Sequence, residues 1–156
     1  MATILGDAGW LDIILGEQHY ALPLQQVQEV IREADITPVP GAARAIIGVI
    51  HLRGDIITII DMRERLGLPP HPDGPKGPSS RRLVIVHDGT DLVGVRVDDV
   101  GAVLNLEADA RQPLPEGRPQ RDSDPVMAAV PAEDGFIALI DPQRLCQITA
   151  TETSQP

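Results

Sequence analysis

Short apolar runs make up much of the chain, and most of them come in pairs separated by a turn that contains Gly. An apolar run, a Gly-containing turn and a second apolar run together give the strongest local signal for a β-hairpin. The four pairs cover residues 10–24, 46–61, 81–98 and 125–141, and one further run covers 100–106. We therefore predict a mostly β, antiparallel protein. The edges of so many short strands in 156 residues favour closed barrels over one open sheet.

One longer segment has a helical pattern. Residues 23–34 (PLQQVQEVIREA) carry Pro23 near the first turn, and three apolar residues recur at helical spacing on one face. Glu29 lies away from that face and is the better candidate for an exposed contact. The three apolar residues are Leu24, Val27 and Ile31, and of these we expect Val27 and Ile31 to be core rather than contact.

Two short helices and three irregular segments complete the prediction. DMRERLGL (61–68) has Asp61 as a possible N-cap and ends at Gly67, and DPQRLC (141–146) has the same kind of start. Residues 69–80 contain five prolines and are predicted to form a solvated loop, as are residues 112–125. The tail from residue 150 is polar and is expected to be disordered.

The tripeptide Arg53-Gly54-Asp55 resembles an adhesion signal, but its neighbours favour a tight turn. If Gly54 and Asp55 form a two-residue type II′ turn, Arg53 lies opposite Ile56. Alternation then gives one face of pure core, made of Ile50, Leu52, Ile57 and Ile59. The other face mixes apolar and polar residues, as a partner-binding patch would: Val49, His51, Arg53, Ile56, Thr58 and Ile60.

Composition narrows the class of function. The net charge is −10, with 23 acidic and 13 basic residues, which argues against binding to nucleic acid or to an anionic membrane. The single cysteine, Cys146, cannot form an internal disulfide, and no apolar run approaches the ~20 residues that span a bilayer. No signal peptide is recognisable at the N-terminus. We therefore expect a cytoplasmic protein.

Four motifs, in order along the chain, resemble the CheW-like family of coupling proteins in bacterial chemotaxis. The first is HYALPLQQVQEVIREADITPVPGA and the second is GVIHLRGDIITIIDMRERLGL. The others are LVGVRVDDVGAVLNL and GFIALIDPQRL. The resemblance runs from about Trp10 to Cys146. Three features depart from the family pattern: His51 in place of Asn, Arg96 where an apolar residue is common, and the proline-rich loop.

The resemblance implies two small SH3-like, five-stranded β-barrels that share an apolar core, with a few short helices. It implies one domain over residues 10–148, flanked by flexible termini (1–9 and 149–156). It also implies a cofactor-free, non-enzymatic adaptor at membrane receptor arrays. Its partners would be a chemoreceptor's cytoplasmic tip and the regulatory domain of a CheA-type histidine kinase. The matched residues are Val27, Glu29, Arg53 and Val97 for protein contact, and Gly48, Gly54 and Asp61 for turns, packing or capping.

Several of these residues have a plainer interpretation. Arg53 could anchor a partner through its planar guanidinium, or it could bond to local carbonyls or to Asp55. Gly48 is expected to allow close packing and Gly54 to form the turn. His51 could sense pH at an interface, but a strand histidine paired across to Thr58 is the commoner case.

Other functions fit the residues less well. Asp55 and Asp61 are separated by about 20 Å of extended strand, so they cannot act as a carboxylate pair. The four histidines and Cys146 lack the paired spacing of a zinc site, and no phosphate loop or nucleophile elbow is present. Two alternatives remain: an adaptor of a non-flagellar chemosensory pathway such as surface motility, and a barrel that binds a small molecule in a closed apolar cavity.

Overall fold

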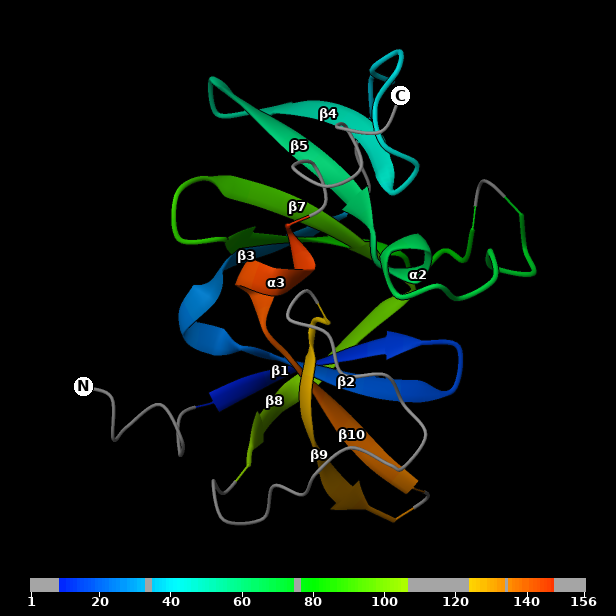
Figure 1. Ribbon diagram of the computed structural model, residues 1–156, viewed down its shortest axis with the longest axis vertical. Helices are drawn as coiled ribbons and strands as arrows, with labels where there is room; N and C mark the ends of the chain where they lie inside the picture. The colour runs from blue at the N-terminus through cyan, green and yellow to red at the C-terminus, as the bar shows by residue number, and fades with distance from the viewer. Residues whose placement is uncertain (1–8, 33–34, 75–76, 107–123, 134, 148–156) are drawn as a thin grey trace.

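The computed structural model describes residues 9–32, 35–74, 77–106, 124–133 and 135–147, which form two five-stranded sheets and short helices (Figure 1). The first sheet has the order β8-β1-β2-β10-β9, and the second has the order β3-β6-β7-β5-β4. The first sheet contains β1 (Gly9–Leu15), β2 (Gln18–Pro23), β8 (Asp99–Asn105), β9 (Val126–Ala132) and β10 (Gly135–Ile140). The second contains β3 (Val27–Arg32), β4 (Ile46–Leu52), β5 (Asp55–Asp61), β6 (Arg82–His87) and β7 (Leu92–Val97).

The hairpin predictions are confirmed, and so is the mostly β class. All four predicted pairs form antiparallel hairpins: β1–β2, β4–β5, β6–β7 and β9–β10. The run at 100–106 forms β8, which pairs antiparallel with β1. Two pairings are parallel, β10 with β2 and β5 with β7, and each joins one hairpin of a sheet to the other.

The helix predicted over residues 23–34 is wrong. A short 3₁₀ helix, η1 (Leu24–Gln26), leads directly into strand β3, whose residues alternate between half-buried and exposed. Val27, Val30 and Ile31 are β-branched and lose side-chain freedom in a helix, whereas they pack well on a pleated surface. Pairing of β3 with β6 across the sheet therefore overrides the apparent helical spacing.

The turn of the β4–β5 hairpin also differs from the prediction. Leu52 pairs with Asp55, so the two turn residues are Arg53 and Gly54, and both have positive φ (52° and 87°). This is the backbone of a type I′ turn, which follows the right-handed twist of the strands. The predicted pairing of Arg53 with Ile56 is therefore wrong, but the faces are as predicted, because the pairing shifts by an even number of residues. Ile50, Ile57 and Ile59 are buried on the core face.

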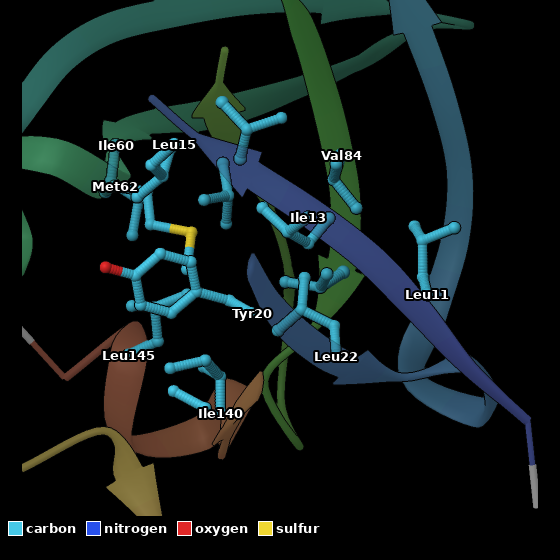
Figure 2. Packing of buried hydrophobic residues seen from close by; sticks show 14 of the residues in the cluster. Leu11, Ile13, Leu15, Tyr20, Leu22, Ile60, Met62, Val84, Ile140 and Leu145 are labelled. Atoms are coloured by element: carbon cyan, nitrogen blue, oxygen red, sulfur yellow. The ribbon is translucent and has the colours of Figure 1, made fainter. Parts of the chain in front are cut away.

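One apolar cluster joins the two sheets, as the prediction of a shared core requires (Figure 2). The first sheet contributes Leu11, Ile13, Leu15, Tyr20, Leu22 and Ile140, and the second contributes Ile60, Val84, Val86, Val93, Val95 and Val97. A smaller cluster packs on the opposite face of each sheet: Trp10, Ala21, Val130 and Leu139 in the first, and Ile50, Ile57, Ile59, Leu83 and Ile85 in the second.

Two short helices close the junction between the sheets. Helix α2 (Met62–Arg65) follows β5, and α3 (Pro142–Leu145) follows β10. Each has an aspartate N-cap: the Asp61 carboxylate accepts from the Arg63 backbone N–H, and Asp141 accepts from Gln143. The helices bury Met62 and Leu145 in the shared core. The guanidinium of Arg65 donates to the backbone oxygens of Leu145 and Arg144, which ties α2 to α3.

The sheets curl in the SH3-like manner, but they are not the closed barrels expected. In the second sheet, a single bridge between Thr37 and Val49 brings the segment after β3 against β4, with two hydrogen bonds of 2.9 Å. Gly48 makes this approach possible, because a Cβ atom there would overlap the Thr37 carbonyl and lie 2.8 Å from a methyl of Ile36. The ladder does not extend beyond this bridge.

Some predictions concern residues that lie outside the described part of the chain. The termini predicted to be flexible lie outside the described residues, except for Gly9, which begins β1. The predicted loop at 112–125 lies outside them up to residue 123. In the part of the chain that the structure describes, no helix has both the length and the apolar character that a bilayer crossing requires.

We expect Gly48→Ala to lower the free energy of unfolding by about 3 kcal/mol, because the methyl group has to displace backbone rather than a flexible side chain. Gly54→Ala is the control: its position is open, so only backbone strain of about 1 kcal/mol is expected. Urea unfolding of both variants measures the difference. Equal losses would contradict the close-approach role of Gly48.

Candidate protein-contact site

The tip of the β4–β5 hairpin holds an exposed ion pair. The guanidinium of Arg53 donates to both carboxylate oxygens of Glu29, with 2.8 Å between Nη2 and Oε2. The Arg53 side chain is 71% exposed, whereas that of Glu29 is 21% exposed. The hydrogen bond from Arg53 lowers the pKa of Glu29, and the carboxylate in turn raises the pKa of Arg53. A two-point contact of this kind fixes the plane of the guanidinium while leaving it open to solvent.

Strand β3 aims Glu29 toward that tip through a β-bulge. Val27 pairs with Val86 but Glu29 pairs with Ile85, so the register shifts between them. The extra residue rotates the strand, and Val27 packs against the shared core while Glu29 shares a face with Ile31. The bulge thus places the Glu29 carboxylate within hydrogen-bonding reach of Arg53 in the β4–β5 turn. The prediction that Glu29 points away from Ile31 is wrong, because it assumed a helix.

The other predicted contact residues differ in accessibility. Val27 is half-buried, and Val97 is 1% exposed within the shared core. A side chain so enclosed has no surface to offer a partner, so the structure contradicts the contact predicted for Val97. Ile56, by contrast, is 66% exposed on the outer face of β5, directly opposite the exposed His51. The predicted pairing of His51 with Thr58 is wrong.

A groove of about 560 Å³ lies beside that outer face. It runs between β5, the start of β7, the β6–β7 turn and the residue that follows α3, Cys146. Its lining combines apolar side chains with three aspartates, Asp55, Asp88 and Asp91. Burial raises the pKa of the Cys146 thiol to about 12, so this group is neutral at physiological pH. The groove is open to solvent on one side and is not a closed apolar cavity.

Sequence reasoning missed a buried ionic network around Asp98. Its carboxylate lies 2.6 Å from Nη2 of Arg63 and accepts the backbone N–H of Gly16 at 2.8 Å. His71 of the proline-rich loop is 3.8 Å away, and the hydroxyl of Ser80 donates to the Asp98 backbone oxygen. The network therefore connects the β1–β2 turn, α2 and the loop. These partners are far apart in sequence, so no local signal could reveal them.

Two opposing effects set the protonation of this network. Burial alone would raise the pKa of Asp98, but the hydrogen bonds from Arg63 and Gly16 and the charge of Arg63 hold it below its ordinary value. The same contact raises the pKa of Arg63. Arg96, a departure from the family pattern, lies nearby and reaches the Asp61 carboxylate at 3.4 Å. These groups stabilise structure, since each charge is matched by a neighbour.

The described residues hold no arrangement suited to metal binding, because no three His, Cys, Asp or Glu side chains among them come together.

The site residues predicted from sequence fall into two places. Glu29, Arg53 and Gly54 meet at the hairpin tip. Asp61 and Gly48 lie in the helix cap and in the bridge to Thr37.

Comparisons with known proteins agree with one another. Residues 10–149 match the family model described as "CheW-like domain". The chain is 27% identical to a probable chemotaxis protein CheW of Rhizobium etli, covering 96% of this chain and 94% of that protein. It is 29% identical to the chemotaxis protein CheW of Bacillus subtilis, over 89% and 86%. The crystal structure of the scaffolding protein TtCheW from Thermoanaerobacter tengcongensis superposes with a TM-score of 0.80 at 27% identity, covering 94% of this chain and 97% of that one.

The network around Asp98 leads to a prediction of acid sensitivity. The pKa of Asp98 is lower in the folded than in the unfolded state, so its stabilising contribution is complete above about pH 4 and is lost as the pH falls through the folded-state pKa. Asp98→Asn should cost about 3 kcal/mol at neutral pH, because it leaves Arg63 buried without its counter-charge. It should also remove this part of the pH dependence.

Urea unfolding between pH 2 and 7 provides the measurement. Asp99→Asn is a matched control, since among the described residues the Asp99 carboxylate accepts only the neighbouring Val100 N–H, which an asparagine can also bond. The control should lose less than about 1 kcal/mol. If the two stability–pH curves of wild type and Asp98→Asn run parallel, the network is not what confers the acid sensitivity.

Proposed function

The chain belongs to the CheW-like domain family, and from this premise we propose that it couples chemoreceptor tips to a CheA-type histidine kinase. Proteins of this family are chemotaxis scaffolds or adaptors without catalytic activity, so this chain acts by binding and not by reaction. Coupling requires at least two contact surfaces on one rigid body. We place the protein on the cytoplasmic side of receptor arrays, because both proposed partners present their binding regions there.

The observation that carries this proposal is the exposed guanidinium at the tip of the β4–β5 hairpin. Glu29 holds Arg53 in one orientation while the guanidinium stays exposed. Arginine is one of the residue types enriched at the energetic centre of protein interfaces. Because Glu29 restrains the guanidinium beforehand, less conformational entropy is lost on binding. We propose that this tip contacts the kinase's own CheW-like regulatory domain.

The receptor is proposed to bind elsewhere, in the groove beside β5. A chemoreceptor tip is helical in this proposal, and a helix can dock through side chains alone when a groove offers apolar surface. The open groove next to α3 is such a surface, and it contains residues from the second sheet together with Cys146. Receptor state and kinase activity would then be linked by a coupling free energy carried through one protein body.

We expect Arg53→Asn to weaken binding to the kinase regulatory domain by at least tenfold, because it removes the guanidinium at the proposed contact. Asparagine tolerates the positive φ of this position, so the turn is retained. The measurement is a titration of labelled protein against two separate partners, the kinase regulatory domain and a receptor cytoplasmic fragment.

Arg44→Asn provides the matched control. Arg44 is 86% exposed and also pairs with a glutamate, Glu64, but it lies before β4 and away from the hairpin tip. This variant should bind both partners within about twofold of wild type, a difference that corresponds to under 1 kcal/mol. If wild type binds neither partner, the coupling function is refuted. If both arginine variants bind the kinase domain equally well, the contact is not at Arg53.

A further inference from the structure

The groove beside β5 carries acidic side chains and no permanently charged cation in its lining. Its rim carries the carboxylates of Asp55, Asp88 and Asp91, and its lining includes no lysine or arginine. The chain as a whole has a net charge of −10, so its long-range field also attracts cations. We call this surface the acidic groove, defined by Asp55, Asp88 and Asp91 on the rim and by the accessible apolar residues Ile56 and Leu92 that line it with them.

The rim carboxylates are available to a ligand. Asp88 is held by its own turn, because its Oδ1 accepts the backbone N–H groups of Thr90 and Asp91, both at 2.8 Å. The Asp55 and Asp91 side chains have no ion pair or hydrogen bond to any other described residue. Three carboxylates thus line one groove without a lysine or arginine beside them, so a cationic partner would find complementary charge there.

The backbone around the groove excludes one common docking mode. Strand β5 is hydrogen-bonded to β4 on one side and to β7 on the other, and β7 is itself flanked by β6. Neither strand has a free edge, so a partner cannot add a strand here. Binding must therefore occur through side chains. The apolar lining and the exposed Ile56 suit the apolar stripe of a helix.

From this geometry we infer that the acidic groove binds a basic amphipathic helix of a partner protein, with apolar residues on the lining and Lys or Arg side chains on the rim carboxylates. The inference rests on the proposed function in taking the receptor tip as the occupant, and it adds the chemistry which that tip must present. It also implies that binding weakens with salt, since rim charges act through solvent.

The first test uses defined probes. Two synthetic helices of about five turns share one apolar stripe, and their polar faces carry Lys in one and Glu in the other. Fluorescence anisotropy measures their binding to wild type and to Asp55→Asn/Asp88→Asn/Asp91→Asn. Asparagine can keep the hydrogen bonds of the Asp88 turn. We expect the Lys helix to bind wild type, to lose at least tenfold in affinity with the triple variant, and the Glu helix not to bind.

A second triple variant separates the groove from the general attraction of an acidic chain. Glu17→Gln/Asp35→Asn/Glu133→Gln removes the same charge at three exposed positions that do not line the groove. It should change the affinity for the Lys helix by less than about threefold, as expected for screened, distant charges. Equal losses in the two triple variants, or no binding of the Lys helix to wild type, would overturn the inference.

Titration of the receptor fragment distinguishes failure of this inference from failure of the proposed function. A tenfold loss of receptor affinity in the groove variant, with the control variant unchanged, supports both. Unchanged receptor affinity in the groove variant overturns the acidic groove as the docking site but leaves the coupling function standing. If wild type does not bind the receptor at all, the proposed coupling fails and so does the assignment of the receptor tip to the groove.

Discussion

The structure depends on one apolar cluster that both sheets bury together. Each sheet has only five short strands, and sheets of this size need a partner layer to cover the apolar face. The shared core supplies that layer, because Ile13 and Leu22 of the first sheet pack in the same cluster as Val84 and Val95 of the second. The two lobes therefore form one folding unit, and their relative position is fixed by packing. The coupling proposed for this chain depends on such a fixed arrangement.

The two sheets also repeat one arrangement. Each has an edge strand, then a hairpin, then a parallel pairing to a second hairpin that is followed by a short, aspartate-capped helix. In the second sheet all five strands are continuous in the chain, whereas the first sheet takes its central hairpin, β1–β2, from the other end of the described chain. The two sheets are thus joined in two ways: the chain enters and leaves the second sheet between strands of the first, and both sheets pack on the shared core. This explains why α2 and α3, at equivalent positions, meet where the sheets join.

The limits of prediction from the sequence follow from the range of the interactions involved. Hairpins were predictable because turn and strands are adjacent, and the caps Asp61 and Asp141 because helix starts are local signals. Strand β3 was not predictable, since Val27 and Ile31 fit helical spacing. Only the pairing with β6, which is distant in sequence, decides between a helix and a strand there. The type I′ turn was missed because it requires a positive φ at Arg53. The partners of Asp98 and the walls of the acidic groove come from distant segments, which no local pattern connects.

The β4–β5 hairpin brings the two proposed contact surfaces within three residues of each other. Arg53 at the tip is tied to Glu29, while Asp55 forms part of the rim of the acidic groove. These residues share the same rigid turn, and β5 continues from it into the shared core and then α2. A partner that moved Asp55 would thus also change the geometry of the Arg53–Glu29 ion pair. Because coupling between two binding events needs a common element that both can bias, this hairpin is the shortest physical path between the two surfaces.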